Sequence, residues 1–233
     1  MQRQHIPNFL TMLRLVIAAA FFGVLQLYRY GAQPASPGWV LPTAVVLFVL
    51  AALTDALDGH LARKWDVVSK FGRIMDPFCD KILILGAVIY LASPRFLDHA
   101  AVAGGELRTM ISGVYPWMVV LVVARELLVT GIRGEVEKAG IAFGANWIGK
   151  LKMILQSVVV PLVLIIVMID PRQHPWLGWV RDVLVYATVI ATVFSGWPYV
   201  TGAMRAFASQ RPTPGGSADG DELPTATDPP AGG

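Results

Sequence analysis

The stretch LTDALDGHLARKWDVVSKFGRIMDPFCDK, residues 53–81, decides how this chain folds and what it can do. It places four aspartates, Asp55, Asp58, Asp76 and Asp80, in or beside segments that are otherwise apolar enough to lie in a membrane. A carboxylate taken out of water without a partner is costly, so ionisable residues in such segments are candidates for function. Something must therefore compensate these four charges.

The composition around this stretch predicts an integral membrane protein. The 233 residues are 55% hydrophobic and only 15% charged, and the mean hydropathy is +0.57, whereas a soluble domain usually carries about 25% charged residues. A soluble helical core would show polar faces at helical spacing, which runs such as LVIAAAFFGVLQLY lack. Six stretches approach the roughly 20 apolar residues that a spanning helix needs: 9–28, 39–58, 74–93, 114–132, 153–170 and 179–203. We expect an all-α membrane protein with six transmembrane helices, surrounded by a lipid bilayer and without a nucleic-acid partner.

Basic residues predict the orientation. With the N-terminus in the cytoplasm, 14 of the 19 Lys and Arg residues would lie on the cytoplasmic side and 5 on the other, so both termini are expected to be cytoplasmic. No A-x-A-like cleavage site follows the first apolar run, so that run is expected to stay as a span. We expect one membrane domain, 1–208, in the cell (inner) membrane, and a disordered tail, 209–233, which is rich in Pro, Gly, Ser and Thr.

Helical spacing gathers the aspartates into two pairs. Asp55 and Asp58 are three residues apart, and Asp76 and Asp80 are four apart, so each pair shares one helix face. The polar connection between them would bring the two pairs together at the cytoplasmic ends of the second and third spans. Four facing carboxylates repel one another unless cations lie between them. Oxygen ligands favour Mg²⁺ or Mn²⁺, and four carboxylates suffice for two such ions, which can clamp phosphoryl oxygens in a displacement.

Small residues on the same faces indicate space for a ligand. Gly59 and Gly72 lie beside the aspartates at a cost in helix propensity, and Ala62 continues the clear strip. Arg63 offers a fork for a phosphate and Ser69 a hydroxyl. The alternative is purely structural: the first aspartate pair would end the second span, and the second pair would begin the third, where negative charge suits a helix N-terminus.

These residues resemble a known family. Residues 55–80 match the signature D-x2-D-G-x2-A-R-x8-G-x3-D-x3-D of the CDP-alcohol phosphotransferases at every fixed position. The resemblance implies a six-helix membrane enzyme that transfers a phosphatidyl group from a CDP-linked lipid to an alcohol and releases CMP. It implies that the four aspartates hold two divalent metals and that Asp80 is the general base. It also implies CDP contacts from Gly59, Ala62, Arg63, Ser69 and Gly72, and a homodimer is implied by this resemblance alone.

The acceptor alcohol depends on segments outside the signature. Residues 5–15, HIPNFLTMLRL, resemble the N-I-P-N-x-L-T-x-x-R opening of bacterial phosphatidylglycerophosphate synthases, which adds Asn8 and Thr11 to the expected lipid-donor contacts. AREL at 124–127, Arg133 and GKLKMILQ at 149–156 resemble the R-E, R and G-K-x-K-T-x-x-Q elements of the same group, with Met153 in place of the usual threonine. The basic residues of these segments are expected to bind an acceptor phosphate: Arg14, Arg125, Arg133, Lys150 and Lys152.

The sequence therefore favours transfer of the phosphatidyl group from CDP-diacylglycerol to sn-glycerol 3-phosphate, because several cations beside a metal site favour binding of an anionic acceptor. The nearest alternative keeps the chemistry and changes the acceptor to phosphatidylglycerol, inositol phosphate or serine. The alternative is that these cations only follow the positive-inside bias that every membrane protein shows.

Two alternatives come from other classes. A prenyl-transfer or ring-building Mg²⁺-diphosphate enzyme would show a tighter D-D-x-x-D run, which is absent from the sequence. A cation-coupled transporter would place charges near the bilayer midplane and often carry a repeat, whereas these charges cluster at one face.

Overall fold

The structure is a computed structural model that describes residues 5–65, 70–138 and 147–209. At residues 5–11, 56–65, 70–77, 79–80, 137–138, 147–151 and 206–209 it describes the backbone only. Ser69 and the expected tail from residue 210 onward lie outside the described residues. The elements are α1 (His5–Leu25), α2 (Val40–Trp65), α3 (Lys70–Leu91), the 3₁₀ turn η1 (Pro94–Phe96), α4 (His99–Ala103), α5 (Pro116–Lys138), α6 (Trp147–Ile169), α7 (Pro175–Phe194) and α8 (Trp197–Ser209).

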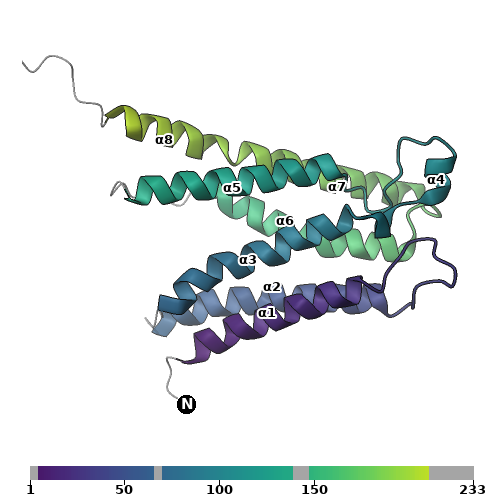
Figure 1. Ribbon diagram of the computed structural model, residues 1–233, viewed down its shortest axis with the longest axis horizontal. Helices are drawn as coiled ribbons and strands as arrows, with labels where there is room; N and C mark the ends of the chain where they lie inside the picture. The colour runs from purple at the N-terminus through teal and green to yellow at the C-terminus, as the bar shows by residue number, and fades with distance from the viewer. Residues whose placement is uncertain (1–4, 66–69, 139–146, 210–233) are drawn as a thin grey trace, which may run out of the picture.

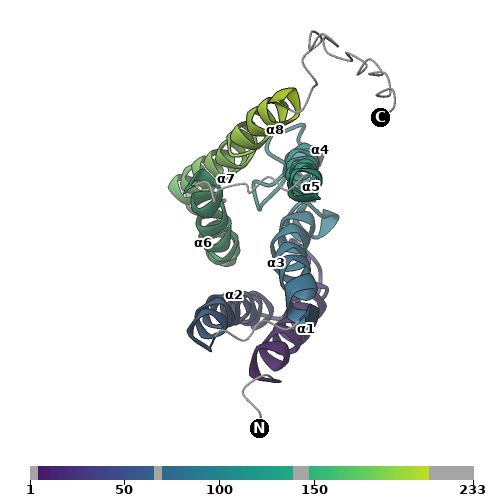
Figure 2. The ribbon, with the colours of Figure 1, turned by 90° about the vertical axis from the view of Figure 1, so that its left-hand side faces the viewer.

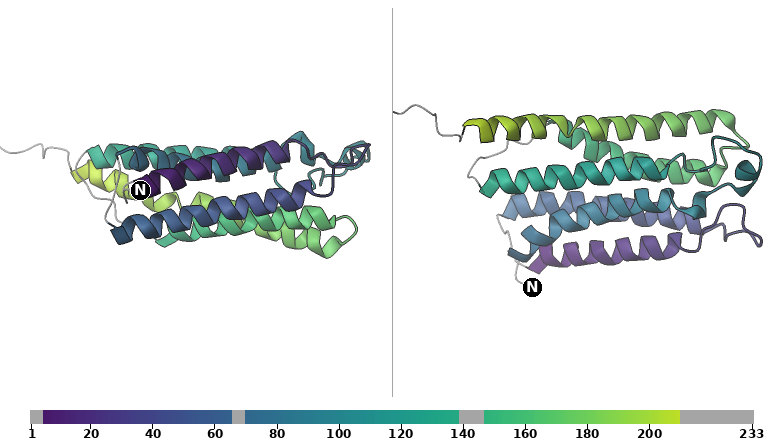
Figure 3. Two further views of the ribbon diagram at one scale, coloured as in Figure 1. Left: turned by 90° about the horizontal axis from the view of Figure 1, so that it is seen from below. Right: turned by 45° about the horizontal axis from the view of Figure 1, so that its top comes forward.

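The long helices form a closed ring. Contacts run from α1 to α2, then to α6, α7, α5 and α3, and from α3 back to α1, with α8 packed on α5. Figure 2 views the bundle roughly along the helix axes, and the helices run roughly side by side in Figures 1 and 3. The described residues contain only an isolated bridge, between Leu97 and Met110, and no strand. The expected all-helical class is thus confirmed for the described chain.

The direction of the helices separates the two ends of the ring. The end of α2, the start of α3, the end of α5 and the start of α6 lie at the same end as the N-terminus (Figure 1). The loop with η1 and α4, together with the start of α7, lies at the other end (Figure 1). The signature of residues 55–80 therefore lies at one end, and we call this the signature end and the other the loop end.

The last apolar stretch differs from the expectation of one continuous helix over 179–203. The chain instead forms α7 and α8, with Ser195 and Gly196 between them. Gly196 N donates to Val193 O at 3.0 Å, a tightened last turn. Pro198, in the first turn of α8, has no N–H to continue a helical ladder, so the helix restarts there.

Two segments of the described chain are apolar enough in length and composition to cross a membrane: Lys152–Ile169 in α6 and Pro175–Arg205 in α7 and α8. Shorter apolar helices occupy Met12–Leu25, Val40–Asp55 and Lys81–Leu91. Large apolar side chains also point outward from several helices, including Val16, Val120, Leu127 and Val183, each more than 60% exposed. Extended apolar surface of this kind marks contact with a membrane or a partner.

Aromatic packing fixes how α1 meets α2 and α3. Phe21 and Phe48 are fully buried with ring centroids 5.5 Å apart, and Phe22 stacks on Tyr90 at 5.3 Å. Gly86 of α3 leaves room for this stack, because a Cβ there would lie 2.3 Å from the Phe22 ring. A glycine costs helix propensity, so its place here follows from the close approach of the two helices.

Ion pairs fasten the loop end. Arg172, after α6, pairs with Asp98, the N-cap of α4, and with Glu106 at 3.3 Å. Tyr30 donates to Asp170 Oδ1 at 3.3 Å, and burial followed by the Asp170 carboxylate raises the pKa of Tyr30 to about 12. The phenol therefore stays protonated and keeps this hydrogen bond at neutral pH.

The contact at Gly86 can be tested by Gly86→Leu. The new side chain would displace the Phe22 ring from Tyr90, and overpacking of this kind typically costs about 1–3 kcal/mol. We expect a lower thermal midpoint in detergent, measured by intrinsic fluorescence or by aggregation. Gly131→Leu on α5 is the matched control, because a Cβ at Gly131 meets nothing within 4 Å. Equal midpoints for the two variants would contradict the packing described.

Candidate active site

Asp55 is held by an arginine from the neighbouring helix. Arg14 Nη1 of α1 lies 2.6 Å from Asp55 Oδ1 of α2, and the Arg14 side chain is only 1% exposed whereas that of Asp55 is 40% exposed. The arginine thus offsets a carboxylate at the start of the signature. The structure brings Arg14, expected at the acceptor phosphate, to the aspartate side of the site.

The remaining signature residues lie on the two helices that meet at the signature end. Asp58, Gly59, Ala62 and Arg63 follow Asp55 on α2, while Gly72, Asp76 and Asp80 lie on α3, which contacts α2. Asn8 and Thr11 lie on α1. For all of these the structure describes the backbone only, and Ser69 lies outside the described residues.

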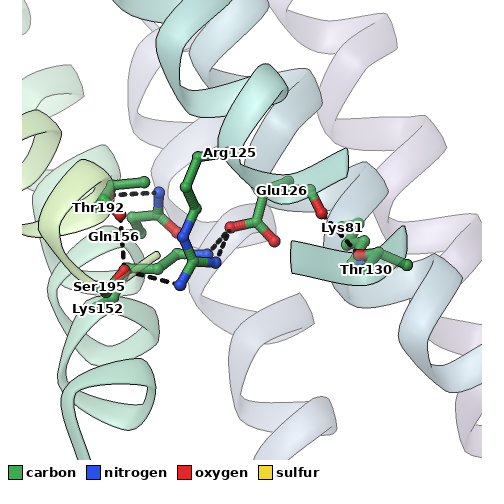
Figure 4. A network of polar contacts seen from close by, with 8 residues as sticks. All are labelled: Lys81, Arg125, Glu126, Thr130, Lys152, Gln156, Thr192 and Ser195. Atoms are coloured by element: carbon green, nitrogen blue, oxygen red, sulfur yellow. Dashed lines mark hydrogen bonds and ion pairs between the residues drawn. The ribbon is translucent and has the colours of Figure 1, made fainter. Parts of the chain in front are cut away.

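Arg125, Glu126 and Lys152 form a buried ion cluster between α5 and α6 (Figure 4). Arg125 Nη1 donates to Glu126 Oε1 at 2.9 Å, and Lys152 Nζ donates to the same oxygen. All three side chains are buried, with exposures of 9%, 11% and 7% in that order. One carboxylate therefore holds two cations, which leaves a net positive charge inside the bundle.

The break between α7 and α8 completes the surroundings of Arg125. Its Nη2 donates to Ser195 Oγ at 2.7 Å, and its guanidinium lies 6.0 Å from the Tyr199 ring centroid. A Cβ on Gly196 would lie 3.4 Å from Arg125 Cγ, so the glycine admits the arginine stem. Arg125 Nε is buried and has no hydrogen-bond partner among the described residues. A buried donor left unpaired is uncommon and indicates a site for a missing acceptor.

Further hydroxyls and an amide tie the cluster to its neighbours (Figure 4). Ser195 donates to Thr192 O at 2.6 Å, and Gln156 Nε2 of α6 donates to Thr192 Oγ1 at 3.2 Å. Such a network fixes the position of Ser195 and, through it, of the Arg125 guanidinium.

A hydrogen bond connects the ion cluster to the signature helix. Lys81 Nζ of α3 donates to Thr130 Oγ1 of α5, and Thr130 in turn donates to Glu126 O at 2.7 Å. Lys81 directly follows Asp80 in the chain. The helix that carries the last two signature aspartates is thereby joined to the helix that carries the buried cations.

Arg133, another expected acceptor residue, stands apart from this cluster. Arg133 is exposed and lies two helical turns beyond Arg125 on α5, about 12 Å along the axis. Lys150 lies in the first turn of α6, where the structure describes the backbone only. The structure therefore brings together Arg125 and Lys152 of the five basic residues predicted to bind the acceptor.

Sequence reasoning missed most partners of the cluster. Gln156 falls within the GKLKMILQ stretch and Glu126 within AREL, but the sequence analysis assigned a role to neither residue. Ser195, Thr130 and Tyr199 carry no pattern that sets them apart from other polar residues in apolar helices. Only the helix arrangement shows that they meet Arg125 or its neighbours.

Known proteins share these segments. The sequence profile of the CDP-alcohol phosphatidyltransferase family matches residues 4–194. The chain belongs to this family.

It is 34% identical over 209 residues to a protein named probable phosphatidylglycerophosphate synthase from Mycobacterium tuberculosis, covering 90% of this chain and 86% of that protein. It is 29% identical over 201 residues to the CDP-diacylglycerol–glycerol-3-phosphate 3-phosphatidyltransferase of Bacillus subtilis (84% and 93% covered), and 30% identical over 213 residues to that of Mycoplasma genitalium (85% and 82%). The resemblance drawn from the signature is confirmed, and the chain is a membrane phosphatidyltransferase of this type.

One aspartate of the signature in this CDP-alcohol phosphatidyltransferase keeps oxygen capacity for a divalent cation. Among the described side chains no group of three His, Cys, Asp or Glu residues gathers, but three of the four signature aspartates fall where only the backbone is described. Asp55 is the signature aspartate whose side chain the structure describes. Arg14 engages its Oδ1, and a carboxylate has about four lone-pair positions, so the half-exposed group keeps capacity for a metal. Oxygen donors alone suit Mg²⁺ or Mn²⁺.

The ion cluster can be tested by Glu126→Gln. Removing the shared carboxylate leaves Arg125 and Lys152 buried without a counter-charge, which for buried pairs costs about 3–5 kcal/mol. We expect a marked drop in the thermal midpoint of the purified protein. Glu135→Gln, on the exposed side of the same helix, is the control and should change the midpoint little.

A double variant separates charge from shape. Adding Lys152→Met to Glu126→Gln removes one of the two orphaned cations, so part of the lost stability should return. If the double variant is less stable than Glu126→Gln alone, the cluster does not act through charge compensation.

Proposed function

We propose that this phosphatidyltransferase moves the phosphatidyl group from CDP-diacylglycerol to sn-glycerol 3-phosphate, giving phosphatidylglycerophosphate and CMP. The relatives from Bacillus subtilis and Mycoplasma genitalium bear the name of this reaction. The observation that carries the proposal is the buried Arg125–Glu126–Lys152 cluster, because its net positive charge and the unpaired Arg125 Nε suit an anionic acceptor. The Lys81–Thr130 hydrogen bond connects that cluster to the signature helix.

The donor would bind at the signature end between α1, α2 and α3. Asp55, Asp58, Asp76 and Asp80 would hold two divalent cations, which when bound neutralise the diphosphate and stabilise CMP as the leaving group. Arg14 orients Asp55 through its contact with Oδ1. The expected contacts to the CDP-lipid are Asn8, Thr11, Gly59, Ala62, Arg63, Ser69 and Gly72.

Asp80 would accept the proton of the attacking hydroxyl. A carboxylate of ordinary basicity can serve, because the hydroxyl becomes strongly acidic only as its bond to phosphorus forms. The oxygen–hydrogen bond breaks toward Asp80, the new oxygen–phosphorus bond forms, and the bond from phosphorus to CMP breaks. The proton leaves to water after CMP departs.

The acceptor phosphate would bind against Arg125 and Lys152. In the structure both cations rest on Glu126, so the phosphate must compete for them or use their remaining donors. Arg125 Nε is one such donor, and a phosphate can accept from two guanidinium N–H groups at once. Arg133 and Lys150 would place further positive charge between the cytoplasm and this binding site. An uncharged or zwitterionic acceptor such as serine gains less from this charge.

The membrane arrangement belongs to the same proposal. Six spans would follow α1, α2, α3, α5, α6 and the α7–α8 pair, with both termini and the signature end in the cytoplasm. The alternating direction of these helices supports this, as does the excess of basic residues at the signature end. The enzyme would then reside in the cell (inner) membrane and take its water-soluble acceptor from the cytoplasm. A homodimer remains part of the proposal.

The acceptor can be identified by CMP release. Purified protein would be given CDP-diacylglycerol, Mg²⁺ and one alcohol at a time: glycerol 3-phosphate, phosphatidylglycerol, inositol phosphate or serine. We expect release with glycerol 3-phosphate and its loss with EDTA. Release with phosphatidylglycerol but not with glycerol 3-phosphate would assign cardiolipin synthesis instead.

The catalytic carboxylate can be tested by Asp80→Asn. The amide cannot accept the proton, and loss of a general base typically costs about 10²–10⁴-fold in rate. CMP release should fall by at least about 100-fold while the thermal midpoint stays near that of the parent protein. Glu135→Gln again serves as the control for a lost carboxylate. Ion flux through liposomes that persists in Asp80→Asn would favour the transporter hypothesis.

A further inference from the structure

A cavity lined by three arginines, each of which is paired with a carboxylate, lies at the loop end, away from the signature. It has a volume of about 260 Å³ and lies between the segment before α5 and the first turns of α7. Its lining contains three arginines, Arg108, Arg172 and Arg181, and one carboxylate, Glu106. Neither the catalytic proposal nor the acceptor site uses any of these residues.

The three arginines differ in how far they are engaged. Arg181 is buried, and its Nη1 donates to Ile111 O at 2.7 Å while its Nε and Nη2 donate to Asp182 Oδ1 at 2.8 and 2.6 Å. Gly113 makes this possible, because it has φ +71° and a Cβ there would lie 2.7 Å from Arg181 Nε. Arg181 is therefore a structural part of the cavity wall, and few of its N–H donors remain for a ligand.

Arg108 is the arginine that keeps its donors available. It is 54% exposed, and its ion pair with Asp182 Oδ2 is 3.5 Å long, beyond a strong charge-assisted hydrogen bond. The guanidinium lies 4.7 Å from the Trp179 ring centroid. This contact fixes the plane of the group, and the N–H donors other than those of Nη1, which faces Asp182, remain for an anion.

Two further features favour an anion in the cavity. Arg172, paired with Asp98 and with Glu106 at 3.3 Å, is still 37% exposed at the same wall. Pro175 and Gly178 bring the N-terminus of α7 to the lining, its first turn contains no acidic residue, and its N-cap His174 makes no side-chain cap. The positive end of the helix thus adds to the arginines.

The polar cavity continues into an apolar one. A second cavity of about 250 Å³ shares Arg108 and Trp179 with the first and is lined further by Tyr115, Asp182, Val183 and Tyr186. Trp179, Val183 and Tyr186 are spaced i, i+4 and i+7, so they form one face of α7. They are 62%, 63% and 43% exposed, and they lie in the apolar segment Pro175–Arg205.

We propose that these two joined cavities bind an anionic phospholipid from the leaflet at the loop end. Its phosphate lies against Arg108 and Arg172, and one acyl chain follows Trp179, Val183 and Tyr186 along α7. The N–H donors that Arg108 and Arg172 do not use in their ion pairs, together with the N-terminus of α7, favour an anionic headgroup, and the mostly apolar groove distinguishes a lipid from a free phosphate. The site assumes that the ring is embedded in a bilayer, and it is independent of which alcohol accepts the phosphatidyl group.

The test measures which lipids the full-length protein retains. Protein equilibrated with phosphatidylserine or phosphatidylcholine in mild detergent would be analysed by native mass spectrometry. Phosphatidylserine is the anionic probe because it is neither the donor nor a proposed acceptor. We expect the parent protein to retain phosphatidylserine over phosphatidylcholine, and Arg108→Gln to weaken phosphatidylserine retention about fivefold, the effect of one basic residue near a charged lipid surface.

Two further variants distinguish the contribution of the arginine at the headgroup from that of the groove for the acyl chain. Arg205→Gln removes an exposed arginine near the end of α8 and should leave retention unchanged. Val183→Glu places a charge in the apolar groove and should weaken retention of both lipids. CMP release should be unchanged in Arg108→Gln, which also confirms that the variant folds.

Four outcomes would overturn the proposal. They are unchanged phosphatidylserine retention in Arg108→Gln, equal retention of the two lipids by the parent protein, displacement of the lipid by inorganic phosphate alone, and loss of a dimer in Arg108→Gln. The third would assign a free-phosphate site and the fourth an interface between two copies of the chain.

Discussion

Charge buried inside an apolar helix bundle has to be compensated locally, and the signature end is organised around this requirement. Arg14 meets Asp55 between α1 and α2, and Glu126 meets Arg125 and Lys152 between α5 and α6. Each pair joins helices whose outer faces are apolar, so the charges cannot turn to water without disrupting the packing. The two groups differ in how the charges are shared: Asp55 faces one arginine, whereas the single carboxylate of Glu126 faces two cations.

The two ends of the ring use ion pairs for different purposes. At the loop end, Arg172 and Arg181 bind carboxylates and a carbonyl from segments between helices, so they fasten loops to the bundle. At the signature end, the paired residues lie within the helices themselves and leave unused capacity, as Arg125 Nε shows. The donors of Arg181 are satisfied by the protein alone, whereas a binding site keeps donors or acceptors for its ligand.

The sequence predicted the helical class and the family, because both depend on local patterns. Apolar runs mark helices whatever their neighbours are, and fixed spacing within residues 55–80 identifies the signature without a structure. The break at Ser195 and Gly196 was missed, since mostly apolar residues continue on both sides of this short interruption. The contact of Arg14 with Asp55 and the bond from Arg125 to Ser195 could not be predicted either. They join residues far apart in the chain, so they depend on which helices become neighbours in the ring, and apolar periodicity contains no information about that order.

The adjacent pair Arg125–Glu126 bears on how the protein enters the membrane during synthesis. In the proposed six-span arrangement, α5 leaves the ribosome before α6, so Lys152 has not yet been synthesised when α5 enters the lipid. A single charge at the centre of an inserting helix costs about 2.5–3.5 kcal/mol. Because Arg125 and Glu126 are neighbours whose side chains meet at 2.9 Å, α5 can insert as an electrically neutral segment. The positive surplus of the site then arises only when α6 arrives with Lys152, once α2 and α3 already present their aspartates.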